Sequence, residues 1–360
     1  MNIGILSQIK EKNITGINRV SKGTLEELKT RDTQNNYFFL GKTQWLNIDF
    51  PTIPIVPNGA KCFDLNFTLL AHPLDIVHSH YRAFTLNSKI PCARIITIHD
   101  LIPLIYKEWY PSLYDYFNEE IRKCAEQADM IIAVSEHTKS DIIKYYGISD
   151  KKIRVVYNGL YPEQLFSSEL KGKVVSELSN KKFILSVSGV GPHKNQVGLT
   201  KAYIYYKEKH PDSDIKLVLV GPVRRYHVVR EILENNPGYV NDIVMTGFVS
   251  DDELLWLYQK ALAFIYVSFY EGFGLPILEA MSVGKAVIAS ETSSLPEVGG
   301  DAALYCDPTD IESIYSAIER VIEDETLRGQ MERKALLQAG KFSYSKAAEE
   351  TMEIYKLFQN

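Results

Sequence analysis

Two glutamates flank a glycine-rich turn in the segment SFYEGFGLPILEA, residues 268–280. Glu271 precedes the turn, and Glu279 follows it within the apolar run ILEAM. Burying a carboxylate costs several kcal/mol unless a partner compensates its charge, so each glutamate requires solvent or a ligand. The chemistry that these residues could perform is therefore the binding of a polar ligand.

This turn lies between a predicted strand and a predicted helix. The run LAFIYVS is typical of a strand, FYEGFGL of the loop beyond its C-terminal end, and Pro276 suits the first helical position. The free amides of Phe273, Gly274 and Leu275 would then point at whatever lies over the helix N-terminus, where negative charge is favoured. A glutamate that only complements the helix dipole, worth ~0.3–1 kcal/mol, explains Glu279 but not the glycine-rich loop.

A lysine follows another predicted strand. The loop VGPHKNQ comes after FILSVSG, and Gly189 and Gly191 shape a tight entry into the next helix. Lys194 near the N-terminus of that helix conflicts with the helix dipole, and an anionic ligand such as a diphosphate would remove the conflict. The alternative is a lysine in solvent. Arg224 and Arg225, after the strand KLVLVG, are further candidates for binding phosphate.

The first half of the chain has two candidates of this kind. Gly16, after the first strand, would let backbone amides approach a phosphate or a sugar, although a plain turn explains it equally well. His99 follows the strand RIITI, where Asp100 helps to mark a stiff loop, and could act in catalysis or bind a hydroxyl. A structural role is the alternative for His99, and it is the preferred interpretation of His78 and His80.

Position relative to the strands excludes one pair of carboxylates. In doubly wound sheets, ligands bind beyond the C-terminal ends of the strands. Asp212 and Asp214 have an Asp-x-Asp spacing found at some metal sites, but they precede the strand KLVLVG. They are interpreted as a solvated turn, and no metal site is predicted.

The order of elements predicts an α/β fold with two doubly wound parallel-sheet domains. Short apolar runs alternate with amphipathic segments, and strands that are apolar throughout indicate sheets covered on both faces. At about 150 residues per domain, 360 residues suggest domains at 1–165 and 166–342, separated by the polar segment 162–182. In the helix EHTKSDIIKYYG, Ser135 is the expected N-cap and Gly147 the stop. The predicted strands are NIGIL, NYFFL, DIVHSH, RIITIHD, MIIAVS and IRVVYNG in the first domain, and KFILSVSG, KLVLVG, IVMTGF, LAFIYVS, KAVIAS and AALYCDP in the second.

Composition narrows the class of protein. The net charge of −5 argues against nucleic acid as a partner. No apolar run approaches the ~20 residues that cross a bilayer, and the N-terminus is interpreted as a strand rather than a signal peptide. The four cysteines are scattered, as expected in a reducing cytoplasm. Residues 1–165 carry 19 Lys and Arg against 18 Asp and Glu, and residues 166–360 carry 21 against 27, so the first half could approach an anionic membrane more easily.

The ordered series of motifs resembles one known family. Glu271, seven intervening residues and Glu279 resemble the signature of retaining glycosyltransferases of the GT-B fold, family four. The likeness continues in TGINRV, IHDLIP, ADMIIAVSEHTKSDIIKYYGI, KIRVVYNGL, GPHKN, TGFVSDDELLWLYQKA, GKAVIAS and PEVGGDAALYCDP. It therefore extends across most of the chain.

The resemblance implies two facing Rossmann-like domains, an acceptor domain followed by a nucleotide-sugar domain, with a final helix at about 343–360 that crosses back to the first. It implies that Glu279 binds the ribose, Glu271 the donor sugar, and Lys194 the diphosphate, with His99 facing the sugar. The donor site implied by the resemblance and the loop analysis comprises Gly16, Gly189, His193, Arg224, Gly247, Phe248, Val249, Gly272, Phe273, Gly274, Leu275 and Glu279, and the catalytic set comprises His99, Lys194 and Glu271.

The chain departs from the family at one position of the site. Many members carry an arginine five residues before the lysine, where this chain has Gly189. Stabilisation of the leaving group would then depend on Lys194 alone, or on help from His193, Arg224 or Arg225.

The expected function is transfer of a hexosyl unit, mannosyl or glucosyl in type, from a UDP- or GDP-sugar to a saccharide acceptor with retention of configuration. The expected role is bacterial surface polysaccharide or O-antigen assembly, without metal or other cofactor, in the cytoplasm or at the inner face of the membrane. The aromatic segment LIYKEWYPSLYDYF could dock a lipid-linked acceptor, stack on sugars or form ordinary core, and core is preferred. The alternatives are a non-catalytic GT-B partner protein, an epimerase or phosphorylase on the same fold, and a sugar-binding receptor.

Overall fold

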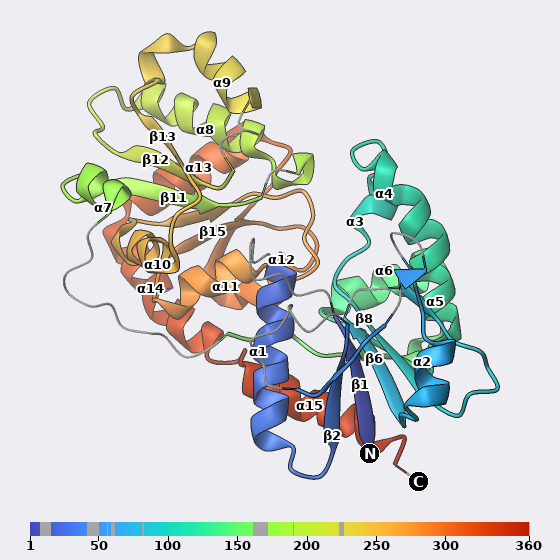
Figure 1. Cartoon of the computed structure of the whole chain (residues 1–360). Coiled ribbons are helices and arrows are strands. Elements are labelled where there is room, and N and C mark those ends of the chain that lie inside the picture. Colours follow the sequence, from blue (N-terminus) through green and yellow to red (C-terminus); the bar gives the residue numbers. More distant parts are fainter. Residues whose placement is uncertain are drawn as a thin grey trace. The chain divides into compact units, whose positions relative to one another are not determined.

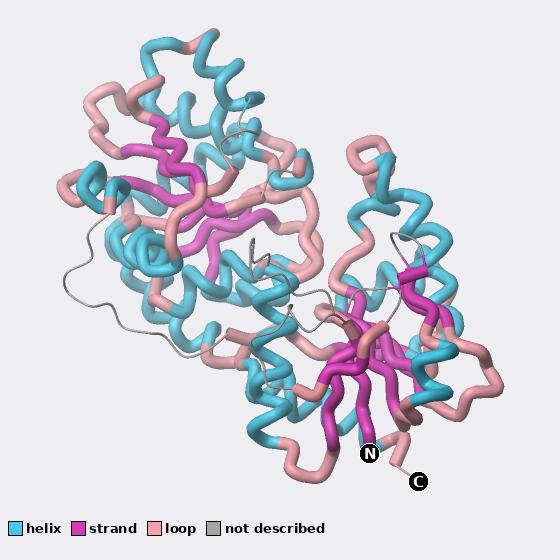
Figure 2. Tube along the Cα trace, in the orientation of Figure 1, coloured by secondary structure: helices cyan, strands magenta, loops and turns pink. Residues whose placement is uncertain are grey.

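A computed structural model of the chain divides into two compact units (Figure 1). Unit 1 comprises Met1–Tyr161 and Phe342–Asn360, and unit 2 comprises Pro162–Lys341. The structure describes residues 1–7, 16–41, 50–55, 57–58, 62–80, 83–160, 172–189, 191–222 and 227–359. Each unit contains its own sheet, drawn as a separate group of strands in Figure 2.

The main sheet of unit 1 has seven strands in the order β10-β9-β8-β6-β1-β2-β3, and every pair is parallel. Its interior strands are buried along most of their length, because helices cover both faces. The strands are β1 (Asn2–Leu6), β2 (Asn36–Leu40), β3 (Thr52–Ile53), β6 (Ile76–His80), β8 (Ala93–Ile98), β9 (Met130–Ala133) and β10 (Ile153–Val155).

Two hydrophobic cores flank this sheet. One packs strand residues against the helices between β6 and β10, and the other packs them against the first and last helices of the chain. The helices of unit 1 are α1 (Gly16–Arg31), α2 (Asn66–Ala71), α3 (Ile102–Ile105), α4 (Pro111–Asp115), α5 (Arg122–Gln127), α6 (Glu136–Tyr146) and α15 (Tyr344–Lys356).

The C-terminal helix α15 is part of the core of unit 1. It lies along α1, and Tyr355 is fully buried beside β6 (Figure 1). Gly23 of α1 permits the close approach, since a Cβ atom there would lie 2.4 Å from the ring of Tyr344. The last residues of the chain therefore stabilise the unit that contains the first.

Unit 2 contains a six-stranded parallel sheet in the order β13-β12-β11-β14-β15-β16. On one face α8, α9 and α13 pack on the sheet, and on the other face α10 and α11 do so. The strands are β11 (Phe183–Val187), β12 (Lys216–Val220), β13 (Ile243–Gly247), β14 (Phe264–Tyr266), β15 (Val287–Ser290) and β16 (Ala303–Cys306). The helices are α7 (Lys173–Leu178), α8 (Gln196–Lys209), α9 (His227–Glu234), α10 (Asp251–Lys260), α11 (Leu275–Ser282), α12 (Leu295–Gly299), α13 (Ile311–Glu323) and α14 (Glu325–Ala339).

The predicted fold class is confirmed, since both units are doubly wound parallel-sheet α/β domains. The predicted cap of α6 is also confirmed: the Ser135 hydroxyl accepts a hydrogen bond from the amide of Thr138, and Gly147 follows the helix with φ +69°. The polar segment 162–182 is not wholly a linker, because it contains α7. Of the aromatic segment after β8, Tyr116 and Phe117 are core, whereas Trp109 is exposed.

Three local features of unit 1 were not predicted. The short strand β3 at the edge of the main sheet is one of them. A small sheet joins β4 (Pro57–Asn58), β5 (Cys62–Asp64) and β7 (Ala83–Thr85), which are too short to produce a periodic pattern. The helical segment between α4 and α5 contains a π-helical turn, Tyr116–Ile121. No helix among the described residues is both long and apolar enough to span a bilayer.

Three buried histidines lie close together in unit 1: His78 and His80 on β6, and His99 directly after β8. His78 contacts the Tyr355 hydroxyl (2.6 Å) and the Thr97 hydroxyl (2.8 Å), which fits its predicted structural role. The rings of His78 and His80 lie 4.3 Å apart. Burial lowers the pKa of His80 to about 4, and burial together with the neighbouring His80 lowers the pKa of His99 to about 3.

We expect unit 1 to lose stability as the pH falls from 7.5 to 5. In the unfolded chain these histidines bind protons near pH 6.5, whereas in the folded unit they stay neutral to a lower pH. His80 alone then lowers the free energy of unfolding by about 2 kcal/mol at pH 5. Thermal unfolding followed by circular dichroism at several pH values measures this slope. His80→Phe should reduce the slope, and replacing the exposed His72 by Gln should not. An unchanged slope in His80→Phe would contradict the assignment.

Candidate active site

The loops that leave the carboxyl ends of the strands of unit 2 carry most of the predicted site. β11 leads to His193 and Lys194, β14 to Glu271, and β15 to Ser293. Since β11, β14 and β15 are consecutive in a parallel sheet, these loops emerge side by side at one edge. Residues up to 100 positions apart in the sequence therefore contribute to one place.

Lys194 and Glu271 form a buried ion pair at this edge. The Lys194 ammonium lies 2.7 and 2.8 Å from the two carboxylate oxygens of Glu271 and 2.9 Å from the hydroxyl of Tyr266. The side chains of Lys194 and Glu271 are 16% and 9% exposed. The alternative that Lys194 is a lysine in solvent is therefore wrong.

The pair keeps both groups charged despite their burial. Burial opposes the charged form of Lys194, but Glu271 and Tyr266 outweigh it and raise the pKa of Lys194 above its usual value. For Glu271, burial is likewise outweighed by Lys194 and His193, which lower the pKa of the carboxyl. Burial and the adjacent Lys194 lower the pKa of His193 to about 4. At neutral pH the site thus holds one ammonium, one carboxylate and one neutral imidazole.

A strained residue fixes the direction of Lys194. The lysine ends a 3₁₀ turn, Pro192–Lys194, and Asn195 follows with φ +52°. The Asn195 side chain caps α8 by accepting from the amide of Gly198, and it donates to the carbonyl of Pro308. These bonds compensate for a left-handed conformation that costs of order 1–3 kcal/mol and is characteristic of functional sites.

Two serines after β15 hold the Glu271 loop. Ser293, at φ +55°, accepts a hydrogen bond from the amide of Glu271 at 2.9 Å. The buried hydroxyl of Ser294 lies 3.0 Å from the Glu271 carbonyl and 2.8 Å from that of Phe273. The loop is therefore anchored at its amide and, through the single hydroxyl hydrogen of Ser294, at one of these two carbonyls at a time.

The loop ends at the N-terminus of α11. Gly274 is the N-cap with φ +112°, and no side chain caps the helix. Pro276 has no amide hydrogen and the Ile277 amide donates to the Gly274 carbonyl at 3.1 Å, so in this turn it is the amides of Gly274 and Leu275 that can face a polar or anionic ligand. The helix begins at Leu275, so Pro276 is its second residue rather than the predicted first. Phe273, which precedes the cap, is buried.

Gly274→Ala should destabilise unit 2 and distort the loop. A side chain is strained at φ +112°, and the added Cβ would lie 2.7 Å from a methyl carbon of Leu295. We expect a loss of about 1–3 kcal/mol, measured by chemical denaturation. Gly189→Ala is the matched control, because nothing lies within 4 Å of the position that its Cβ would take. Equal stability of the two variants would contradict this account of the turn.

Glu279 lies on α11, half-buried, rather than in the fully apolar environment that its neighbours in the sequence suggest. Its carboxylate accepts a hydrogen bond from the hydroxyl of Tyr258 on α10 at 2.8 Å. One oxygen thus has a protein partner, and the side chain stays accessible to a ligand. The buried carboxylate of the two is Glu271.

The remaining donor residues predicted in the second half of the chain occupy the same edge of unit 2 or lie outside the described residues. Gly247 ends β13 at φ +82°, and Phe248 beside it is 81% exposed, followed by a half-buried Val249. Gly189 is exposed two residues after the end of β11, and Gly272 is buried within the Glu271 loop. Arg224 and Arg225 lie outside the described residues.

Gly16 and His99 belong to unit 1. Gly16 is the first residue of α1, and the loop before it, residues 8–15, lies outside the described part of the chain. His99 follows β8 at the carboxyl edge of its own sheet and is buried. Its carbonyl accepts a hydrogen bond from the Thr138 hydroxyl at 3.4 Å.

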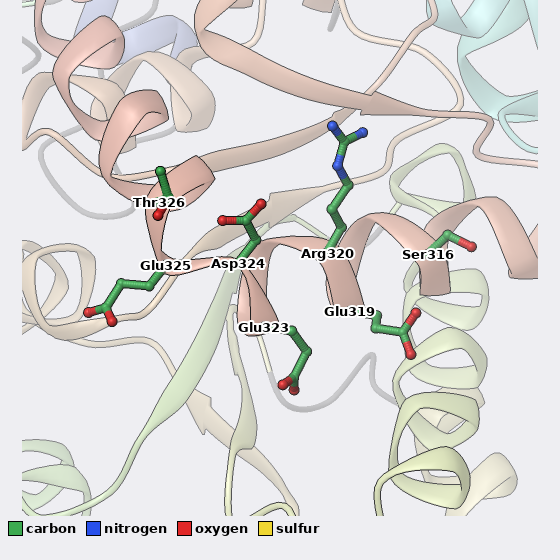
Figure 3. A pocket seen from close by; sticks show the side chains of 7 residues that line it. All are labelled: Ser316, Glu319, Arg320, Glu323, Asp324, Glu325 and Thr326. Carbon is green, nitrogen blue, oxygen red and sulfur yellow. The ribbon is translucent and has the colours of Figure 1, made fainter.

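Unit 2 also has an open pocket away from this site, at the junction between α13 and α14 (Figure 3). Because α13 runs back from the end of β16, this junction belongs to the opposite edge of the sheet. Its acidic residues already have local partners: Glu319 contacts His210 at 2.8 Å, and Asp324 caps α14. The rejected pair Asp212 and Asp214 is exposed before β12. Within the described ranges no three His, Cys, Asp or Glu side chains are grouped as metal ligands.

Sequence reasoning missed four residues of the site: Tyr258, Tyr266, Ser293 and Ser294. Tyr266 carried one signal, a hydroxyl on the last residue of an otherwise apolar strand at the ligand-binding edge. The serines carried a weaker signal, as a pair in the loop after β15. Tyr258 gave none, since an aromatic residue within an amphipathic helix is typical of core.

Comparisons with known proteins identify relatives of the chain. Residues 169–338 match the family described as Glycosyl transferases group 1, and residues 45–164 match Glycosyltransferase Family 4. The O-antigen chain mannosyltransferase B of Escherichia coli is 31% identical over 275 residues, covering 73% of this chain and 70% of the relative. The serotype-specific mannosyltransferase WbdA of Escherichia coli is 28% identical over 299 residues, covering 79% of this chain. The matched residues make up 36% of WbdA, so this chain spans about a third of the length of that relative.

The fold also has relatives among solved structures. The Anabaena protein HepE, solved in complex with UDP and glucose, superposes with a TM-score of 0.71 at 18% identity, and the match covers 99% of both chains. At this identity the likeness shows the fold.

Proposed function

This chain belongs to the family 4 glycosyltransferases of group 1, with the GT-B fold, and we propose that it transfers a hexosyl unit from a nucleotide sugar to a saccharide acceptor with retention of configuration. The proposed role is assembly of a bacterial surface polysaccharide such as an O-antigen, at the cytoplasmic side of the membrane. The relatives named O-antigen and serotype-specific mannosyltransferases support this role and favour a mannosyl donor.

One observation carries the proposal: the buried Lys194–Glu271 pair at the carboxyl edge of the sheet, beside the uncapped N-terminus of α11. A buried ion pair contributes little net stability, because desolvation of two charges offsets their attraction. Its position at a ligand-binding edge, on a strained and multiply anchored loop, is that of functional groups.

The proposed roles follow from the charges. Lys194 and the first amides of α11 stabilise the negative charge that develops on the departing diphosphate, which is usually the largest catalytic contribution in such a step. Glu271 binds the hydroxyls of the transferred sugar, and Glu279 those of the ribose. The loop Gly247–Val249 borders the base. The departing diphosphate oxygen takes the proton of the acceptor hydroxyl, without a covalent glycosyl-enzyme intermediate and without a metal ion.

Thermal shift against UDP- and GDP-sugars tests the proposal. A specific donor at 100 times its Kd stabilises the fold by about 2.7 kcal/mol, and GDP-mannose is the donor expected to do so. Incubation of the stabilising donor with and without saccharide acceptors, followed by product analysis, then separates a transferase from an epimerase. A chain that no nucleotide sugar stabilises would overturn the proposal, and turnover lost with EDTA would overturn metal independence.

A further inference from the structure

Tyr266 is a chemical exception in its surroundings. It ends β14 and is 2% exposed, its ring stacks on Phe264 at 6.0 Å, and the alternation of β14 places both rings on one face of the sheet, where Phe264 also contacts Tyr258 of α10. A phenylalanine would fill this space equally well. The hydroxyl must therefore be explained by its contacts: its oxygen accepts a hydrogen bond from the ammonium of Lys194 at 2.9 Å, and its hydrogen is donated to the carboxylate of Glu271.

The three hydrogens of the Lys194 ammonium are fully used. An ammonium has three donors, and here two reach the oxygens of Glu271 and the third reaches Tyr266. A phosphate oxygen can gain a hydrogen bond from this ammonium only if one of these three bonds is given up. The bonds to Glu271 are the ones to exchange, because Glu271 is itself proposed to turn to the donor sugar.

From this geometry, and on the basis of the proposed function, we infer that Tyr266 is a positioning residue. Its hydroxyl holds the Lys194 ammonium at the carboxyl edge of the sheet while the lysine exchanges Glu271 for the diphosphate of the donor. Tyr266 is suited to this role because its ring is locked on a strand, whereas Lys194 and Glu271 both lie on loops. A lysine chain has four rotatable bonds, so a fixed acceptor reduces the freedom that the ammonium would otherwise regain.

The environment keeps this acceptor neutral. Burial and the adjacent Glu271 raise the pKa of Tyr266 above its usual value, so the group stays a phenol across the physiological range. A neutral acceptor holds the ammonium without cancelling the charge that the diphosphate needs. At position 189, where the resemblance would place a second cation, the chain has a glycine with open space around it. Without that second cation, stabilisation of the diphosphate depends more strongly on the orientation of the Lys194 ammonium.

Tyr266→Phe tests the inference, because it removes only the hydroxyl. We expect kcat with the preferred donor to fall about 10- to 100-fold, the effect of losing one hydrogen bond to a charged group, with the KM for the donor within about threefold. The affinity for UDP or GDP, whichever is the product, should fall with kcat, since the free diphosphate carries the charge that develops in the transition state. Calorimetric titration measures this affinity.

Two comparisons separate positioning from packing. Tyr203→Phe removes another buried hydroxyl of unit 2, bonded to the Ile215 carbonyl at 2.7 Å, and should leave kcat unchanged. In a double-mutant cycle on UDP or GDP affinity, Tyr266→Phe should have no further effect in a Lys194→Ala background, because Tyr266 acts through that lysine.

The outcomes distinguish this inference from the function on which it rests. A wild-type chain that neither binds nor turns over UDP- or GDP-sugars would overturn the proposed function and the role of Tyr266 with it. An active wild type with unchanged kcat and diphosphate affinity in Tyr266→Phe would overturn the inference alone. An effect of Tyr266→Phe that persists without Lys194 would also overturn it, because the tyrosine would then act independently of the lysine.

Discussion

Lys194→Ala is expected to lower turnover of the nucleotide sugar by about 10²- to 10³-fold, the range measured when one preorganised donor is removed from the charge that develops in a transition state. The ammonium of Lys194 is buried and lies 2.7 Å from a carboxylate oxygen of Glu271. Both residues lie at the edge of the sheet where the diphosphate is proposed to bind. Steady-state assays with the donor found by thermal shift measure the loss. Near-normal turnover would remove Lys194 from the mechanism.

The same substitution should reverse the pH dependence of stability at Glu271. In the wild type the carboxyl has a lowered pKa, so its contribution to stability is present above the unfolded pKa and is lost as the pH falls through the folded one. Without Lys194, burial dominates and raises the pKa of Glu271. The variant should then be less stable by about 3–5 kcal/mol at neutral pH and should recover part of this loss on acidification.

Lys194→Met combined with Glu271→Gln is the matched control for this stability effect. The double variant removes both charges while nearly preserving side-chain volume, so it should be more stable at neutral pH than Lys194→Ala alone, although it should be inactive. Denaturation at pH 7.5 and pH 5 measures the difference. If the single variant showed the wild-type pH slope, Glu271 would not depend on Lys194 for its charge.

Glu279→Ala is expected to weaken UDP or GDP binding by about 10²-fold or more while leaving the fold nearly intact. A carboxylate that accepts two ribose hydroxyls contributes hydrogen bonds of the charged class, each worth about 1.5–3 kcal/mol. Because Glu279 is half-buried and lies at the edge of the sheet rather than in the core, we expect a small change in melting temperature. Calorimetric titration and thermal denaturation together measure both effects.

Two comparisons test whether Glu279 contributes to affinity by binding the nucleoside part of the ligand. Tyr258→Phe removes the hydroxyl that contacts Glu279 but keeps the carboxylate, so the loss of affinity should be several-fold only. Affinity for UMP or GMP should fall in Glu279→Ala as much as affinity for the diphosphate, whereas Lys194→Ala should affect the diphosphate more. If both variants lost monophosphate and diphosphate affinity in the same proportion, the division of roles between Glu279 and Lys194 would be contradicted.

Local patterns predicted the elements that support this site. Apolar runs identified the strands of both main sheets except the two-residue β3, and the side chain of Ser135 caps α6 as predicted, because a cap is a contact between residues three apart. The position of Glu271 after β14 followed from the same local order, and the rule that ligands bind at the carboxyl edge then placed it at the candidate site. Short strands such as β4 and β5 could not be predicted, since two or three residues carry no periodicity.

By itself, the sequence determined two doubly wound domains, the family, and the strand ends at which the charged residues lie. Only the tertiary structure decided that Lys194 pairs with Glu271, 77 residues away, that Tyr266 completes the coordination of the ammonium, and that Glu279 is the more accessible carboxylate. The physical reason is the range of the interactions. Periodicity and caps act within a few residues of the chain, whereas the partner of a buried charge is whichever side chain the packed sheet brings within about 3 Å.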